Sequence, residues 1–382
     1  NLPAKMIDKL QVLDKKSDMA QMTGFDDGEE ETVINLTVKP GMKQGWFGNA
    51  YGGYGSKDRY EGNAMVNRFV NNDQITFMGG ANNTNNMGFS DLASTMFSGM
   101  GGGGGRRGGF GAGSGITSSG NAGLNFSKEF KPDKLTLGGN TRYSHSDNDA
   151  RSKSDRQNIL PGDSSSYDNS EAMSRTKSDN FGVDFRLEWK PDTMTQLIFR
   201  PSFSLSHSMN DNFSDATTLD NERDTVNTNK SSNYSESNGY NLNASIDFSR
   251  KLNNKGRVFS ATLSGGNSDS YSDGMNRSDI VYFNQTDALK NSIIDQRSRY
   301  DNKGFNYRAY VSWVEPIGHN NFIQATYSIS QRKQEALKNV YNQDADGIYN
   351  VLDSAYSQSY RNNFISQRAS LSFKSQRAKF NY

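Results

Sequence analysis

The chain has 382 residues, with 43 Lys and Arg against 42 Asp and Glu, and no cysteine. The near-zero net charge gives no indication of nucleic acid as a partner, and the lack of cysteine excludes a disulfide framework. Its mean hydropathy of −0.84 would suit a disordered chain. However, 22 Phe and 18 Tyr are too many aromatic residues for disorder and are typical of strands that are apolar on one face only.

The first 40 residues differ from the rest of the chain. Residues 2–10 predict a short helix, because a proline stands near its start. Residues 11–14 predict a strand, and residues 32–39 predict a second one. No apolar run anywhere is long enough for a transmembrane helix, which needs about 18 residues.

From about residue 44 onward, apolar and polar residues alternate for about ten positions, and a turn or loop follows each segment. In residues 181–189 every odd residue is apolar and every even residue is Gly, Asp, Arg or Glu. Side chains on a strand point alternately to its two faces, so each segment has one apolar and one polar face. About twelve strands are predicted in this way: 46–54, 60–69, 74–83, 121–130, 134–144, 181–189, 196–207, 240–249, 257–266, 305–314, 322–331 and 364–374.

A soluble β-sandwich also alternates, but the charges on the polar faces favour a barrel. In the core of a sandwich, burying each of these charges without a partner would cost roughly several kcal/mol. Facing a water-filled lumen, the same side chains cost little while the apolar face meets lipid. The inward charges are Asp184, Arg186, Glu188, Lys190, Arg200, Asp247 and Arg308.

The lengths of the connections support the same interpretation. Outer-membrane barrels have short periplasmic turns and long extracellular loops. Short connections at 71–73, 131–134, 190–193, 253–256 and 316–320 alternate with predicted long loops at 84–120, 146–179, 209–236, 270–302 and 334–361. The predicted fold class is therefore an all-β, antiparallel transmembrane β-barrel. Aromatic residues near the segment ends, Trp46, Trp189 and Trp313 among them, suit the girdles of such barrels.

The stretch Val33-Ile34-Asn35-Leu36-Thr37-Val38-Lys39 and the earlier Gly24-Phe25-Asp26-Asp27-Gly28 carry a family resemblance. The chain resembles the plug-and-barrel TonB-dependent receptors, particularly those of the Bacteroidetes. The resemblance implies that residues 1–40 are the C-terminal part of a plug domain and residues 41–382 the N-terminal portion of an outer-membrane barrel of 22 strands. The chain is then a partial one. Implied partners are outer-membrane lipid, a TonB-type periplasmic energy-coupling protein and a surface lipoprotein.

Residues 342–353 nearly match a calcium-binding loop. Oxygen ligands at positions 1, 3, 5 and 12, with Gly at position 6, suit the ion. The candidate ligands are Asn342, Asp344, Asp346 and Asp353, with Gly347 at the turn. The alternative is an ordinary Asp-Gly hairpin turn. Apart from this calcium, no cofactor is expected.

Two other features of the sequence bear on its chemistry. The glycine run at 99–113, with Arg106 and Arg107 inside it, is interpreted as a flexible surface loop, with RNA binding as a weak alternative. His145, His207 and His319 lie in different segments and are not expected to converge on a metal ion. No catalytic constellation is visible, so the chain is predicted not to be an enzyme.

The leading functional interpretation is an outer-membrane receptor or transporter that binds a ligand at the extracellular face and passes it through the plugged barrel. The alternative is a structural or adhesive surface barrel that anchors a partner protein without transport. An outer-membrane enzyme with its site at the rim is a weaker third. Polar lumen residues such as Arg186, Glu188, Arg200 and Arg308 could line a path, and substrate identity is not readable from the sequence.

Overall fold

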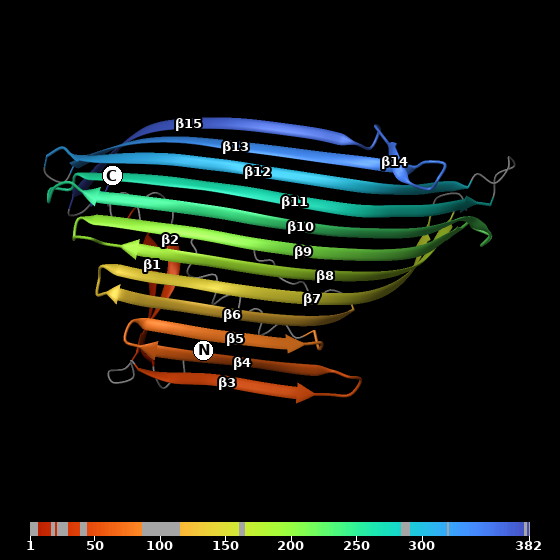
Figure 1. Cartoon of the computed structure of the whole chain (residues 1–382), viewed down its shortest axis with the longest axis horizontal. Coiled ribbons are helices and arrows are strands. Elements are labelled where there is room, and N and C mark those ends of the chain that lie inside the picture. Colours follow the sequence, from red (N-terminus) through yellow and green to blue (C-terminus); the bar gives the residue numbers. More distant parts are fainter. Residues whose placement is uncertain are drawn as a thin grey trace.

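The computed structural model describes residues 7–16, 20, 30–38, 44–85, 115–159, 165–283, 291–318, 321–377 and 380–381. These residues form two antiparallel sheets (Figure 1). The small sheet pairs β1 (Ile7–Lys16) with β2 (Glu30–Val38). The large one contains every later strand, which confirms the predicted all-β, antiparallel fold class. None of the described residues belongs to a helix that is long and apolar enough to cross a membrane.

The large sheet is a meander in which neighbours along the chain are neighbours in space. Its order runs from β16 at one edge to β3 at the other, with the short β14 paired to β13 outside this path. All twelve strands predicted from alternation are present. The bounds are β3 (Gln44–Tyr54), β4 (Tyr60–Val70), β5 (Asp73–Asn82), β6 (Ile116–Lys131), β7 (Leu135–Asn158), β8 (Ser166–Trp189), β9 (Thr195–Leu219), β10 (Thr225–Lys251), β11 (Val258–Tyr282), β12 (Ser292–Pro316), β13 (Asn321–Gln343), β14 (Tyr349–Leu352), β15 (Gln358–Arg377) and β16 (Phe380–Asn381).

The short turns lie where the sequence predicts them, all at one end of the sheet (Figure 1). Residues suited to positive φ make them possible: Asn71 between β4 and β5 has φ 57°, and Asp133 between β6 and β7 also has φ 57°. Asn and Asp tolerate this left-handed region better than other non-glycine residues. Gly256, between β10 and β11, has φ 100°.

The N-terminal helix prediction is wrong for the residues that the structure describes. Ile7 to Leu10, the end of the predicted helix at 2–10, belong to β1 and pair with β2, with Leu10 opposite Leu36. Residues 2–6 lie outside the described residues. Forming the first turn of a helix is unfavourable, and a helix of nine residues gains few backbone hydrogen bonds in return. In the hairpin with β2, the same residues form cross-strand backbone hydrogen bonds instead. The predicted strands at 11–14 and 32–38 are confirmed.

Four of the predicted long loops are mostly strand. β7 and β8 continue through most of 146–179, β9 and β10 through 209–236, β11 and β12 through 270–302, and β13 and β15 through much of 334–361. In the remaining predicted loop, 84–120, β6 begins at Ile116. Residues 86–114, which include the whole glycine run, lie outside the described residues. The strands from β7 to β13 are 23 to 27 residues long. A tilted membrane-spanning strand needs only about 9–11 residues.

These strand extensions escaped prediction because they lack an apolar face. Alternation of apolar and polar residues indicates a strand only when one face is apolar. The backbone hydrogen bonds between strands do not need such a pattern of side chains. Cross-strand ion pairs support the extensions: Arg175 Nη2 lies 2.7 Å from Asp147 Oδ2, and Lys153 Nζ lies 3.1 Å from Glu171 Oε1. Opposite charges on adjacent strands stabilise a sheet modestly, by about 0.2–1 kcal/mol a pair.

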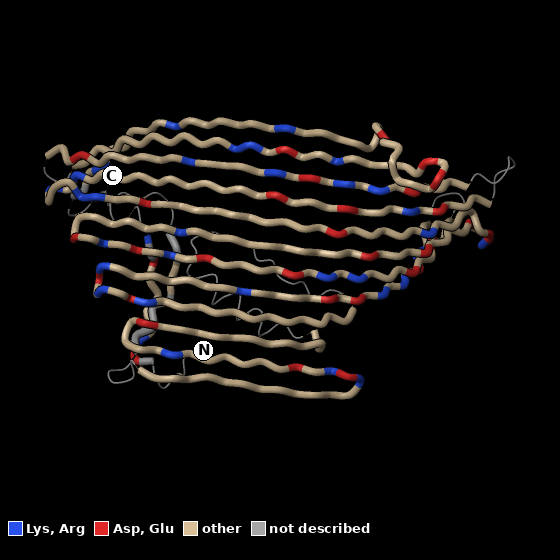
Figure 2. The backbone as a smooth tube through the Cα atoms, in the orientation of Figure 1, with Lys and Arg blue, Asp and Glu red and all other residues tan. Residues whose placement is uncertain are grey.

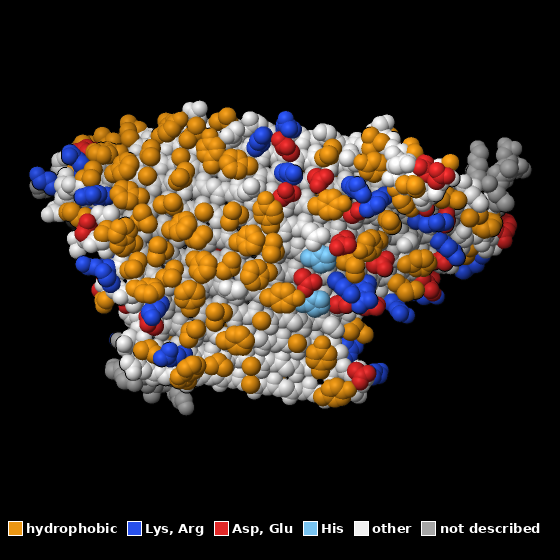
Figure 3. Space-filling model, viewed as in Figure 1, with side chains coloured by type: hydrophobic (Ala, Val, Ile, Leu, Met, Phe, Trp, Pro, Cys, Tyr) orange, Lys and Arg blue, Asp and Glu red, His pale blue; other side chains and the backbone are white. Residues whose placement is uncertain are grey.

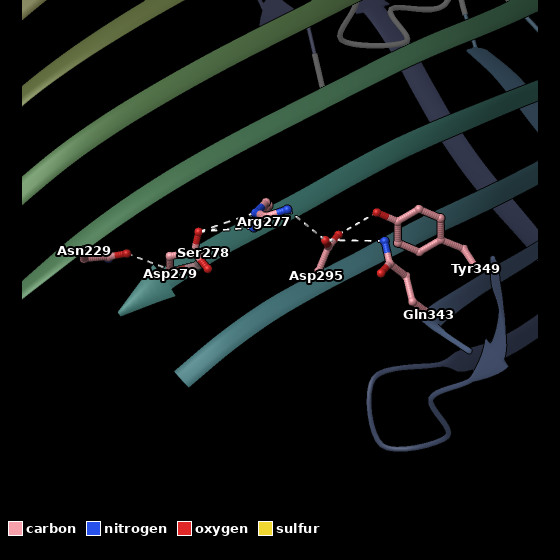
Figure 4. A network of polar contacts seen from close by, with 7 residues as sticks. All are labelled: Asn229, Arg277, Ser278, Asp279, Asp295, Gln343 and Tyr349. Atoms are coloured by element: carbon pink, nitrogen blue, oxygen red, sulfur yellow. Dashed lines mark hydrogen bonds and ion pairs between the residues drawn. The ribbon is translucent and has the colours of Figure 1, made fainter. Parts of the chain in front are cut away.

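A polar network ties five strands of the extension together near its far end (Figure 4). Asp295 of β12 accepts hydrogen bonds from the Tyr349 hydroxyl of β14, at 2.6 Å, and from Arg277 of β11, at 3.5 Å. Ser278 of β11 donates to Asn229 of β10 at 2.9 Å, and Gln343 of β13 donates to Asp295 at 3.5 Å. The extension is thus held laterally by side chains as well as by its backbone.

The pairing register separates the side chains of the large sheet into two faces. On one face an apolar band crosses the strands near the short turns; Phe181 lies opposite Tyr143 and Leu205, and Leu205 lies opposite Tyr240. Figure 3 shows this band, with charged side chains gathered beyond it over the extensions. Figure 2 shows the same enrichment of charge along the extended part of the strands and at the turns. The other face carries mainly Ser, Thr, Asn and charged residues.

Replacing Gly256 by Ala should destabilise the fold by about 1–3 kcal/mol, the usual strain of a non-glycine residue in a disfavoured φ region. An added Cβ would lie 2.7 Å from Phe322 Cε1, so the neighbouring hairpin would also have to shift. Urea unfolding in detergent measures the loss. The matched control is Gly53→Ala, where nothing lies within 4 Å of the added Cβ. Equal effects in the two variants would contradict this account of the turn.

The extension should loosen in acid. The Arg175 guanidinium donates to Asp147 and holds the pKa of that carboxyl below its usual value, and Arg297 does the same to the pKa of Asp273. A lowered pKa contributes stability at pH values above the unfolded pKa of about 3.9, and this stability is lost as the pH falls through the folded value.

Hydrogen exchange of the β7–β8 extension, corrected for intrinsic rates, should therefore show protection that falls below about pH 4. In Asp147→Asn protection should be lower at neutral pH and change less with acid. The control is Asp301→Asn on β12, which alters the same face of the sheet as Asp147. Asp301 lies opposite Tyr271 and Leu337 and not opposite an arginine. Protection that is independent of pH in the unaltered protein would contradict the role of these pairs.

Candidate functional site

The polar face of β7 to β11 holds three groups of paired charges. The register places six of the seven predicted inward charges on this face, opposite the apolar band: Asp184, Arg186, Glu188, Arg200, Asp247 and Arg308. The seventh, Lys190, directly follows the end of β8. The first group joins β7 and β8: Asp184 accepts hydrogen bonds from Asn140 Nδ2 at 2.7 Å and from Arg142 Nη1 at 3.1 Å. Asn140 is fully buried, whereas the Arg142 side chain is half exposed.

The second group surrounds Glu188 of β8. Its carboxylate lies 2.7 Å from Lys190 Nζ and 3.4 Å from Arg186 Nη2. Gln196 of β9 donates to it at 2.9 Å. The carboxylate thus has three donors, and a single negative charge stands between two cations. The group is net cationic and lies near the short-turn end of the sheet.

The third group joins β9, β10 and β11. Arg200 and Asp247 form an ion pair, and Thr262 donates to the same carboxylate at 2.7 Å. Both charged side chains are only about one-fifth exposed, at 21% and 20%. A pair so far removed from water depends on its partners, because an uncompensated charge there is costly.

Hydroxyl and amide groups continue this face toward β13. Ser260 and Ser312 are buried, and Gln324 donates to Ser312 at 2.9 Å. Arg308, the remaining predicted inward charge, lies 6.0 Å from the centre of the Tyr310 ring. The face as a whole offers many donors and acceptors that are already positioned by hydrogen bonds. Such a surface can face water or bind a polar ligand.

The candidate calcium ligands fall in a β-hairpin. Asn342 is the last residue of β13 that pairs with β12, and Asp344 to Gly347 form the turn into β14. Asp344 Oδ1 accepts the backbone N–H groups of Asp346 and Ile348, both at 2.9 Å. Asn342 Nδ2 donates to Asp353 at 3.1 Å, so these two residues do come together. Among the described residues no group of three or more His, Cys, Asp or Glu is placed to hold a metal ion.

This geometry agrees with the alternative of an Asp-Gly hairpin turn. The carboxylate of Asp344 is engaged with the backbone of its own turn, which holds its pKa below the usual value. That engagement gives Asp344 a structural role without any ion. Calcium binding by Asn342, Asp344, Asp346 and Asp353 stays a prediction.

Two of the three histidines come together, which the sequence did not predict. His145 of β7 and His207 of β9 both lie opposite Asp179 of β8, on the apolar-band face. His145 Nδ1 lies 2.8 Å from Asp179 Oδ1, and the Tyr143 hydroxyl donates to the same atom at 2.6 Å. The two histidines mark the border between the apolar band and the charged extension (Figure 3). His319 lies outside the described residues.

No protein-family model matches this chain, and a search of curated proteins finds no match. Among solved structures it is similar to the ferric-catecholate import receptor Fiu of E. coli K12 in its open form. The two share 9% sequence identity with a TM-score of 0.34, over 91% of this chain and 66% of the receptor chain. The chain thus spans slightly less than two thirds of that protein. The cargo in that receptor's name belongs to that receptor.

Removing one partner of the Arg200–Asp247 pair should cost more than removing both. Asp247→Ala removes a carboxylate that pairs with Arg200 and leaves the guanidinium charge in a poorly hydrated position. We therefore expect the free energy of unfolding to fall by about 1–3 kcal/mol. The double variant Arg200→Met, Asp247→Ala should recover part of that loss. Unfolding in detergent, analysed as a double-mutant cycle, measures the coupling. The control Ser245→Ala changes the β10 residue opposite Arg200. Strictly additive losses would contradict the pairing.

Proposed function

We propose that the chain is part of an outer-membrane receptor that binds a ligand at its extracellular face and passes it through a plugged barrel. The observation that carries the proposal is the two-faced large sheet. One face has a continuous apolar band and the other has paired charges and hydroxyl groups. A sheet with these two faces suits lipid on one side and an aqueous lumen on the other.

The apolar band supports a location in a membrane. Many of its side chains are exposed, including Leu242 at 49% and Leu263 at 56%. They belong to neighbouring strands and form one surface with Phe181 and Leu205 (Figure 3). Soluble monomers rarely expose contiguous apolar patches larger than a few hundred Å². Lipid that covers the band would remove this surface from water.

The ends of the strands support an orientation. The five predicted short turns lie at one end, and the extensions lie at the other, where 220–224 also forms a tight turn (Figure 1). In outer-membrane barrels the short turns are periplasmic, so the extensions would stand on the extracellular side. The N-terminal hairpin of β1 and β2 would belong to the plug, and coupling to a TonB-type protein follows from the resemblance to TonB-dependent receptors.

A second candidate, a surface barrel that anchors a partner protein without transport, is favoured by the extensions. Their lateral ion pairs and the network around Asp295 would make a firm platform above the membrane. Binding of the full-length protein to a TonB-type energy-coupling domain separates the two candidates, since an anchor has no use for that partner.

Tryptophan fluorescence tests the membrane location. Trp46, Trp189 and Trp313 all lie on the apolar-band face toward the short turns. In vesicles of brominated lipid all three should be quenched, and bromines placed high on the acyl chains should quench more than bromines at the chain ends. Reconstituted protein whose fluorescence is unaffected by brominated lipid would contradict the proposal.

A matched pair of variants identifies the face. In a background with the three tryptophans replaced by Phe, a single tryptophan is introduced by Val311→Trp or by Tyr310→Trp. These neighbours on β12 point to opposite faces of the sheet, because Val311 pairs within the apolar band and Tyr310 lies among the polar residues. Lipid bromines should quench the tryptophan of Val311→Trp and leave that of Tyr310→Trp unquenched. A water-soluble quencher should quench the tryptophan of Tyr310→Trp more strongly.

A further inference from the structure

A hollow of about 490 Å³ lies on the apolar-band face, across β7 to β11, where the band meets the charged extension. Two successive rows of the register line it. The row that belongs to the band contributes Tyr143, Tyr240 and Asp269, with apolar side chains between them. The next row contributes Asp179, His207 and Tyr271. Asn180, Ser206 and Gly239, from the row between these two, complete the lining, and none of the three groups of paired charges belongs to it.

The hollow offers mostly hydrogen-bond acceptors. Asp179 has two donors on one carboxylate oxygen, the Tyr143 hydroxyl and His145 Nδ1, and a carboxylate can accept about four hydrogen bonds. His207 Nδ1 lies 2.8 Å from Asn238 Oδ1. With the amide oxygen of Asn238 as the acceptor, this nitrogen donates, and in a neutral imidazole the other ring nitrogen of His207 is an acceptor.

The charges around the hollow are predominantly negative at neutral pH. Asp179 and Asp269 line it, and Glu236 lies 3.9 Å from His207. Lys303 of β12 lies 3.9 Å from Asp269, and its side chain is 63% exposed. An anionic group would therefore meet repulsion here, whereas a cation that donates hydrogen bonds would find complementary partners.

The aromatic residues point to the same ligand class. Tyrosine rings attract ammonium groups through the negative face of the ring, and three tyrosines line this hollow. Phe181 and Leu205 lie on its band side, so a molecule bound here would rest an apolar part on the band and a cation at its border. An amphiphile with a protonated amine has this shape and charge.

On the basis of the proposed membrane location, we propose that this hollow binds the headgroup of a membrane lipid that carries a protonated primary amine. The ammonium would lie against the ring of Tyr240 and next to Asp269 on the facing strand, with the charge of Asp179 two strands away, and the acyl chains would run along the apolar band. The lipid would sit on the outer surface of the sheet, away from the path proposed for the ligand.

Native mass spectrometry of the whole chain in detergent tests the proposal. The probe is an equimolar mixture of phosphatidylethanolamine and phosphatidylglycerol with identical acyl chains, which differ in the presence of the amine. The unaltered protein should retain the amine lipid at least about fivefold better, as expected for one cation–π or charged contact. Soluble phosphoethanolamine should bind far more weakly, since it has no chains to lie on the band.

The double variant Asp179→Asn, Asp269→Asn should lose this preference. The matched control Asp211→Asn removes a carboxylate from the same face of β9, opposite Arg175 and Tyr234 and outside the hollow, and should keep it. If the double variant fails to fold, Tyr240→Leu provides the same test, because it removes the central ring and keeps an apolar side chain. A preference that survives in the variant tested would overturn the proposal.

Equal retention of the two lipids by the unaltered protein, or preference for phosphatidylglycerol, would also overturn it. The tryptophan measurements distinguish this failure from failure of the proposed function. Protein that is quenched by brominated lipid but shows no amine preference is embedded in the membrane and lacks this site. Protein that is not quenched lacks the membrane location on which the site depends.

Discussion

The antiparallel register of the large sheet is the constraint on which the other features depend. Side chains alternate faces with a period of two, so a slip of one residue would exchange the two faces of a strand. Here β9 and β10 stay in register from Thr195 opposite Arg250 to Thr218 opposite Asn227. This unbroken pairing keeps most apolar residues of β9 and β10 on one side. It also brings Arg200 and Asp247, which are distant in sequence, onto the same polar face.

Charged pairs contribute differently to stability in the two parts of the large sheet, the part near the short turns and the extensions. On the polar face near the short turns the pairs are partly withdrawn from water, and each charge there needs its partner because the isolated charge would be costly. Over the extensions the pairs are more exposed; Lys153 and Glu171 are 65% and 69% exposed. Exposed pairs contribute little individually, so the extensions depend mainly on backbone hydrogen bonds and on the number of lateral contacts. This difference predicts that salt and acid affect the extensions before the banded part of the sheet.

The sequence predicted the banded part of the fold well and the extensions poorly, for a physical reason. In residues 181–189 the apolar period is strong, and Asn71 and Gly256 mark turns by their tolerance of positive φ. In residues 146–179 both faces are polar, so nothing in the pattern distinguishes a strand from a loop. The candidate site was predicted in part: the inward charges were identified, but their partners were not, since Arg142–Asp184 requires the register between two strands. The meeting of His145 and His207 at Asp179 depends on two registers at once.

The place where the apolar band ends is also set by the register, and this gives the border its chemistry. Each strand changes from apolar to polar at its own residue, at Tyr143 on β7, Phe181 on β8, Leu205 on β9 and Tyr240 on β10, and the pairing aligns these four residues in one row. The first polar residues beyond them are therefore also aligned, so histidine, aspartate and asparagine from separate strands become neighbours. A membrane boundary would coincide with this row, because moving it by one row in either direction would expose aromatic surface or bury Asp179. The composition of the border is thus a consequence of how the strands pair, and its acceptor-rich hollow follows from the same alignment that creates the band.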